Sequence, residues 1–363
     1  MKITYLTTVP RPKVSGTDAI YQEIDLLQQN FGGELQSLFP FKRPNSWVPR
    51  FAYGLHNYSS IKRKEKDTDV YHLFTNGLHW FPVISHFNKP KILSIVASVG
   101  NVSRRQVQNF SIFDKIIVSN ERDRDTLHGL GLTQTSLIRP GINLKHITEE
   151  SKTIQEDFTL FMASAPWESK QFYSKGIDFL LQVLQQNPRL RLILLWRGIL
   201  EKELLQRLDK YGIEDQVEFV NERVNVNDYL KKAHASILIA NSPNLVKAYP
   251  HSLVESISGG KPVIISQAIP MANYVREKGC GVVLEKFNPV DLEQVINNLI
   301  QNYDYHSSAC GAHLKSDFSV QRFVKNYQQI HLEPTISSIR DLENQQRKPS
   351  DSSTVQIPSF LPR

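Results

Sequence analysis

The residues best suited to chemistry lie between Lys247 and Ser266, where a loop leads through Pro250 and His251 into a short amphipathic segment. Proline is favoured in the first turn of a helix because its missing N–H group is not needed there. A helix that begins here presents unpaired N–H groups and the positive end of its dipole, which suit a phosphate or a diphosphate. Glu255 follows His251 by one turn on the same face, where its carboxylate could accept hydrogen bonds from a ribose diol. The segment therefore predicts a nucleotide site.

A second candidate segment, residues 164–176, connects a predicted strand to a predicted helix early in the second half of the chain. Ligands of open α/β sheets bind in such loops, beyond the carboxyl ends of the strands. Lys175 precedes this helix directly, and Lys170 is a second cation in the same loop. This position makes Lys175 a candidate contact for a bound ligand. The alternative interpretation is a surface lysine at the start of a helix.

Together the two segments resemble the donor site of retaining glycosyltransferases of family 4, the glycosyl transferases group 1, which have the GT-B fold. The resemblance rests on the Lys-Gly pair at 175–176 and on the run from Pro250 to the strand after Pro262. It implies donor or nucleotide contacts by a set of residues in both segments: Lys170, Lys175, Gly176, Tyr249, Pro250, His251, Ser252, Leu253 and Glu255. It also implies that Gly16 approaches the donor phosphate. The base would lie beside three residues after a predicted strand, Glu222, Arg223 and Val224.

The sequence departs from this family around the donor sugar. Lys247 stands where relatives carry a first glutamate, and Ala97 and Ser98 stand where many relatives carry a histidine. A lysine donates hydrogen bonds and accepts none, so it cannot accept sugar hydroxyls, but it favours a departing diphosphate. One hypothesis is that Lys247 partly replaces the family's arginine, which the 164–176 segment lacks. The rival hypothesis is a site that binds nucleotide and does not catalyse.

The residues for which we predict catalytic roles are Lys175, Glu255 and Lys247. His79 lies in a loop at the carboxyl end of a predicted strand and is a candidate contact for the sugar or the acceptor. Asp123-Arg124-Asp125 looks like the metal-binding Asp-x-Asp motif of the GT-A fold. It falls within a predicted helix at 121–127, however, which places its carboxylates on different faces. We predict no metal site and no cofactor, with a nucleotide-diphosphate sugar as co-substrate.

The elements that must position these residues alternate between strand and helix in both halves of the chain, which is typical of βαβ units and a parallel sheet. Predicted strands are 3–8, 69–74, 91–97, 115–119, 158–163, 190–196, 217–220 and 235–240. Predicted helices are 19–29, 121–127, 176–186, 201–211, 226–233, 288–301 and 318–331. The fold class is therefore α/β of the GT-B type, with two Rossmann-like doubly wound domains facing a cleft.

The predicted domains are an acceptor-side domain at 1–145, a nucleotide-sugar domain at 150–316 and a crossover helix at 317–332. Residues 333–363 are rich in Pro, Ser and Gln, a composition that cannot bury enough apolar surface to fold, so we predict a disordered tail. The two cysteines exclude a disulfide framework, and no run of eighteen apolar residues occurs. These features predict a cytoplasmic protein.

Positive charge is concentrated in residues 1–150, which hold 19 Lys and Arg against 13 Asp and Glu. No nucleic-acid-binding motif accompanies this charge, so nucleic acid is not expected as a partner. Residues 45–66 combine basic and aromatic side chains, which suits an anionic membrane surface. Such contact would make the protein peripheral on the inner face of the plasma membrane. The alternative is an ordinary acceptor-side surface.

The resemblance implies a retaining, metal-independent glycosyltransferase. It would move a sugar from a nucleotide-sugar donor to a hydroxyl of a glycan, a lipid-linked acceptor or a small molecule, in polysaccharide or glycolipid biosynthesis. Two alternatives stay open. One is a catalytically silent GT-B protein that binds nucleotide sugar as a scaffold, and the other is a nucleotide-sugar hydrolase or epimerase.

Overall fold

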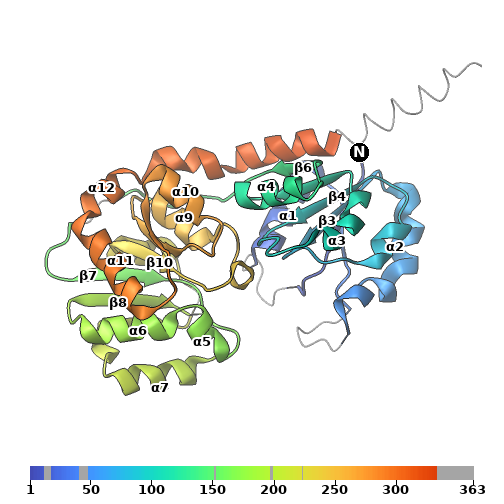
Figure 1. Ribbon diagram of the computed structural model, residues 1–363. Coiled ribbons are helices and arrows are strands. Elements are labelled where there is room, and N and C mark those ends of the chain that lie inside the picture. The colour runs from blue at the N-terminus through green and yellow to red at the C-terminus, as the bar shows by residue number, and fades with distance from the viewer. Residues whose placement is uncertain (12–17, 41–47, 151–152, 197–198, 223, 333–363) are drawn as a thin grey trace, which may run out of the picture.

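The structure, a computed structural model, describes residues 1–11, 18–40, 48–150, 153–196, 199–222 and 224–332. These residues form two six-stranded sheets in which every paired strand runs parallel to its neighbour (Figure 1). The predicted α/β architecture of two doubly wound sheets is confirmed. The predicted disordered tail, residues 333–363, lies outside the described residues.

The first sheet has the strand order β2-β1-β3-β4-β5-β6. Its strands are β1 (Ile3–Thr7), β2 (Glu34–Ser37), β3 (Val70–Thr75), β4 (Lys91–Ile95), β5 (Lys115–Val118) and β6 (Thr135–Leu137). Its helices are α1 (Ala19–Phe31), α2 (Tyr58–Lys64), α3 (Arg104–Val107) and α4 (Glu121–Gly129). Apolar residues of α1 pack on one face of the sheet, and residues of α2, α3 and α4 pack on the other.

The second sheet has the strand order β12-β11-β10-β7-β8-β9. Its strands are β7 (Phe158–Met162), β8 (Leu190–Leu195), β9 (Val217–Val220), β10 (Ala235–Leu238), β11 (Val263–Ser266) and β12 (Gly281–Leu284). Its helices are α5 (Lys170–Ser174), α6 (Ile177–Gln186), α7 (Glu201–Tyr211), α8 (Val226–Lys232), α9 (His251–Ser258), α10 (Ala272–Lys278), α11 (Pro289–Gln301) and α12 (Tyr303–Ser308). One face is covered by α6, α7 and α11, and the other by α8, α9 and α10 (Figure 1).

Helix α1 shows how local sequence sets these elements. The carboxylate of Asp18 accepts hydrogen bonds from the backbone N–H groups of Ile20 and Tyr21, at 2.8 and 3.3 Å, and so caps the helix. Ile20, Ile24 and Leu27 recur at helical spacing and are fully buried against the first sheet. The cap and the apolar stripe together fix where α1 begins and which face it turns inward.

A last helix, residues 320–332, leaves the second half of the chain and packs on the first sheet, as the red-orange helix in Figure 1 shows. The prediction placed it at 318–331; a 3₁₀ segment, Ala312–Phe318, precedes it. A buried chain of hydrogen bonds anchors it. His331 contacts His72 on β3 at 3.1 Å, His72 contacts Ser94 on β4 at 2.8 Å, and Ser94 contacts Tyr327 at 2.9 Å. His72 is thus a core residue with hydrogen-bond partners on both ring nitrogens.

Within the described ranges, the structure contains no helix that is both long enough and apolar enough to cross a membrane.

Candidate functional site

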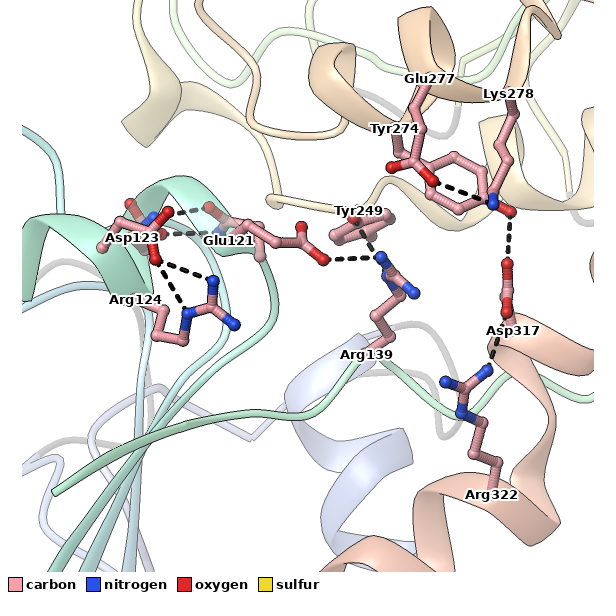
Figure 2. Close-up of polar contacts among 12 residues, drawn as sticks. Glu121, Asp123, Arg124, Arg139, Tyr249, Tyr274, Glu277, Lys278, Asp317 and Arg322 are labelled. Carbon is pink, nitrogen blue, oxygen red and sulfur yellow. Dashed lines mark hydrogen bonds and ion pairs between the residues drawn. The ribbon is translucent and has the colours of Figure 1, made fainter.

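The loops that follow the strands of the two sheets meet each other. Arg122 at the start of α4 donates to the carbonyl of Gln267 at 3.0 Å and to Oδ1 of Asn273 at 2.9 Å, both in the second half of the chain. In Figure 2, Arg139 lies between Glu121 and Tyr249, donating to their oxygens at 2.7 and 3.4 Å. The carboxyl ends of both sheets are therefore held face to face.

Helix α9 opens toward this junction. Pro250 is its N-cap residue, with φ −64° and ψ 125°, and no side chain caps the helix there. Tyr249 and Leu253 direct their side chains into the core, so these two can reach a ligand only through their backbones. His251 and Ser252 are half-buried. Burial, together with the positive charge of Lys247, lowers the pKa of His251 to about 3, so its imidazole is neutral at physiological pH.

Lys175 lies in the turn that leads from α5 into α6. It is only 4% exposed, and its Nζ donates to the carbonyl of Ala165 at 2.8 Å and approaches Oγ of Ser164 at 3.4 Å. Burial lowers the pKa of Lys175 to about 8. Its neighbour Gly176 has φ +65°, and a Cβ there would lie 2.3 Å from Cδ1 of Ile239. Glycine at position 176 is thus favoured both by backbone conformation and by close packing.

The loop that carries Lys247 begins beside the end of α5, because the backbone N–H of Asn241 donates to the carbonyl of Ser174 at 3.0 Å. Lys247 is half-buried, and its Nζ is covered without a hydrogen-bond partner among the described residues. Burial lowers its pKa, which the carboxylates of Asp18 and Glu23 on the other domain act to raise. A buried, unpartnered ammonium group at this position points to an anionic ligand.

Two further predicted site residues, Glu255 and Lys170, differ in how far they are buried. Glu255 is half-buried, and its Oε1 lies 3.9 Å from Nε2 of His146. Lys170 begins α5, a helix that the sequence analysis did not predict; it is 76% exposed and pairs with Glu168 at 3.1 Å. In this arrangement Lys170 is a surface cation and does not share the buried environment of Lys175.

The predicted base contacts are only partly visible. Glu222 is exposed and Val224 is half-buried against the second-domain core. Arg223 and Gly16 lie outside the described residues. His79 is half-buried and its Nε2 lies 2.8 Å from Nη1 of Arg50. Burial, followed by the charge of Arg50, lowers the pKa of His79, so its ring accepts this hydrogen bond in the neutral form.

A cavity of about 620 Å³ next to this junction was missed by the sequence analysis. Its wall is made mainly of small and polar residues from both domains: Ser98, Gly100, Asn101, Val102, Ser103, Gln106, Arg122, Asp123, Thr126, Pro243 and Ala268. The sequence signal that could have indicated this cavity is the place of residues 98–103 in the loop after β4, because loops that follow parallel strands often bind ligands.

The two carboxylates of Asp123-Arg124-Asp125 turn in different directions. Asp123 is buried at the wall of the cavity, where Ser98 and Asn120 donate to its oxygens at 2.8 Å each. Burial raises the pKa of this carboxyl group. Asp125 instead forms an exposed ion pair with Arg124 at 2.8 Å. Among the residues that the structure describes, no cluster of three or more His, Cys, Asp or Glu side chains is arranged to hold a metal ion.

Residues 169–311 match the family model described as Glycosyl transferases group 1. The phosphatidylinositol N-acetylglucosaminyltransferase gpi3 subunit of Schizosaccharomyces pombe is 26% identical over 179 residues, which make up 46% of this chain and 38% of that protein. The match with this curated relative thus spans well under half of its length.

Two solved structures show the same fold over nearly the whole chain. Sucrose-phosphate synthase from Thermosynechococcus elongatus has a TM-score of 0.70 and 14% identity over 93% of this chain and 100% of its own. The Anabaena protein HepE, solved with UDP, has a TM-score of 0.66 and 16% identity over the same shares. The predicted resemblance is therefore confirmed: residues 169–311 match the model of the glycosyl transferases group 1, and the chain has the fold of the GT-B glycosyltransferases.

Proposed function

We propose that this chain is a glycosyltransferase that binds a nucleotide-diphosphate sugar in its second domain and transfers the sugar to an acceptor hydroxyl. The observation that carries the proposal is the covered Nζ of Lys247, which has no hydrogen-bond partner among the described residues and precedes the uncapped start of α9, together with the buried Lys175 in the segment after β7. Ammonium groups and helix N-termini both favour a diphosphate. The solved complexes of HepE with UDP and with UDP-glucose support a nucleotide-sugar ligand.

In this proposal, Lys175 and the backbone at Tyr249–Leu253 hold the diphosphate, and Glu255 holds the ribose. Lys247 donates to the diphosphate as negative charge accumulates on its departing oxygen. The bond from the anomeric carbon to this oxygen breaks while the bond to the acceptor oxygen forms on the same face. The departing phosphate oxygen takes the proton of the acceptor hydroxyl. Because no protein base is required, the replacement of the family's histidine by Ala97 and Ser98 is compatible with transfer with retention.

We assign the acceptor to the cavity of about 620 Å³. Its wall is rich in neutral hydroxyl and amide groups, and its one carboxylate, Asp123, is already bonded to Ser98 and Asn120. Such a wall suits a hydroxyl-rich acceptor. The relation to a subunit of a phosphatidylinositol N-acetylglucosaminyltransferase supports a lipid-linked acceptor with a polyol head.

A lipid-linked acceptor agrees with a membrane-facing role for the described part of residues 45–66. Phe51 and Leu55 are 63% and 61% exposed there, and the nearby Arg63 and Lys66 are also exposed. Exposed apolar side chains beside basic ones favour an anionic bilayer surface. Co-sedimentation with phosphatidylserine vesicles at low salt tests this assignment. Wild-type protein should pellet with the vesicles and a Phe51→Ser/Leu55→Ser variant should not, and wild-type protein that stays in solution would contradict it.

The rival function is a silent GT-B protein that binds nucleotide sugar without transferring it, and Lys247 is the residue that favours it. A thermal-shift screen with UDP, GDP, ADP and their sugars, followed by a donor-consumption assay with hydroxyl acceptors, separates the two. Binding with consumption supports the transferase, and binding without consumption supports the silent protein. If no nucleotide binds, the site assignment is wrong.

A further inference from the structure

A small cavity at the first sheet is lined by polar groups that the proposed reaction does not use. It lies between α1, the carboxyl ends of β4 and β5, and the last helix. Its volume is about 10 Å³, which is room for one water molecule. The polar wall consists of Glu23, Ser94, Ser119 and Tyr327, and the remaining wall is made of isoleucine and valine residues.

Two of these polar groups lack hydrogen-bond partners among the described residues. The Oγ atom of Ser119 is covered and pairs with no described protein atom. The side chain of Glu23 is only 6% exposed, and no described group donates a hydrogen bond to its carboxylate. A buried hydroxyl and a buried carboxylate are both unfavourable when they are left without partners. Because the two groups share one cavity, a single ligand between them can satisfy both.

The Tyr327 hydroxyl connects this cavity to the buried hydrogen bonds of the last helix. It contacts Oγ of Ser94 at 2.9 Å, and Ser94 in turn contacts Nε2 of His72 at 2.8 Å. A phenol hydroxyl both donates and accepts hydrogen bonds. With Ser94 as its one partner among the described residues, the Tyr327 hydroxyl can therefore also bond a group in the cavity.

We propose that the cavity binds one water molecule, which donates to the Glu23 carboxylate and is held by the hydroxyl groups of Ser119 and Tyr327. Three partners are the usual number for a buried water. A calcium ion would need six to eight oxygen ligands, more than this wall supplies, and the volume excludes a larger solute. The water joins α1, the segment after β5 and the last helix through one polar contact.

The charged and titratable groups around Glu23 set the pH at which this water matters most. Burial raises the pKa of Glu23 to about 7, against the opposing charge of Lys247, and Asp18 at the cap of α1 adds to the rise. Tyr327 faces Glu23 from the last helix, and burial raises the pKa of its hydroxyl, which stays protonated. Glu23 therefore ionises near neutral pH. The water should stabilise the fold most above this pH, because hydrogen bonds to a charged group are the stronger ones.

The test is a double-mutant cycle of Ser119→Ala and Glu23→Gln, read as the folding equilibrium constant from urea denaturation at pH 5 and pH 8. Ser119→Ala should lower this constant about tenfold at pH 8, where Glu23 is ionised, and by much less at pH 5. In the Glu23→Gln background, the effect of Ser119→Ala should be small at both pH values. Ser236→Ala is the matched control, because it removes a covered, unpartnered hydroxyl from β10 in the other sheet, and its effect should not vary with pH.

An effect of Ser119→Ala that is equal at both pH values, or equal in both Glu23 backgrounds, would overturn the water site. A second measurement is the pKa of Glu23, followed by NMR. It should rise by about one unit in Ser119→Ala and should also rise in Tyr327→Phe, which keeps the ring packing, and an unchanged value in both variants would refute the linkage. A crystal structure of the wild type should show one water between Glu23 and Ser119, and an empty cavity would contradict the proposal.

Discussion

Replacing Lys175 by methionine should stabilise the ligand-free protein and weaken nucleotide binding by tenfold or more. Burial lowers the pKa of Lys175 from 10.5 to about 8. At 1.36 kcal/mol per pH unit, holding the buried ammonium charged near pH 7 destabilises the fold by about 3 kcal/mol. Methionine is of similar length, is apolar and carries no charge. The variant loses the hydrogen bond to the Ala165 carbonyl, which contributes about 1 kcal/mol. Its free energy of unfolding should therefore exceed that of wild type by about 2 kcal/mol.

The size of this stability gain changes with pH, whereas a packing effect would not depend on pH. The pKa of Lys175 is lower in the folded than in the unfolded state, so wild-type stability rises as pH increases from about 8 to 10.5. The advantage of Lys175→Met should therefore be complete below pH 8 and should shrink toward pH 10. Comparing variant with wild type at each pH removes the contributions of the other titrating groups.

The assay is urea denaturation of wild type and Lys175→Met between pH 7 and 10, with UDP, GDP and ADP titrations at pH 7. Lys170→Met is the matched control, since this lysine is 76% exposed and should affect stability little. A Lys175→Met protein that is less stable than wild type at pH 7, by an amount that does not vary with pH, would refute the reasoning. Nucleotide binding by this variant at wild-type strength would remove Lys175 from the site.

Three further outcomes are expected. Gly176→Ala should lower the free energy of unfolding by about 2–4 kcal/mol in the same assay, because φ is +65° and the new Cβ would lie 2.3 Å from Ile239; an unchanged value would contradict the close packing. Arg139→Ala releases the hydroxyl of Tyr249 before α9 and should raise the donor KM about tenfold in steady-state kinetics; an unchanged KM would show that this contact does not position α9. Because the pKa of Glu23 is raised from 4.5 to about 7, its contribution to stability is complete below pH 4.5 and is lost as pH rises through 7. The free energy of unfolding of Glu23→Gln, relative to that of wild type, should thus increase by up to about 3 kcal/mol between pH 4.5 and 8 in denaturation experiments. A difference that does not vary with pH would count against this.

Sequence patterns predicted the elements that are apolar and strongly periodic. The bounds of α7 (Glu201–Tyr211) and β9 (Val217–Val220) agree with the prediction to the residue. The prediction missed β2 (Glu34–Ser37), an edge strand with no buried residue, and the three-residue β6 (Thr135–Leu137). Both lack the alternation of buried and exposed side chains on which a strand prediction depends. Helix α5 (Lys170–Ser174) was missed because a five-residue helix leaves almost no periodic signal.

The candidate site was harder to predict, because its key contacts join residues that are far apart in the chain. The resemblance to the motifs of family 4 singled out Lys175, Lys247 and the start of α9 as candidates. Neither the electrostatic effect of Glu23 on Lys247 nor the contact of Arg139 with Tyr249 could be predicted from the sequence, since both depend on how the two sheets face each other. The same holds for the cavity that we assign to the acceptor.

The central claim is that Lys175 and Lys247 bind the diphosphate of a nucleotide sugar. The most direct measurement is isothermal titration of the wild-type protein with UDP, GDP and ADP at pH 7, repeated with Lys175→Met and Lys247→Met. We predict that at least one nucleotide binds the wild type and that each substitution weakens this binding by tenfold or more. Binding that is unaffected by either substitution, or no binding of any of the three nucleotides, would contradict the claim.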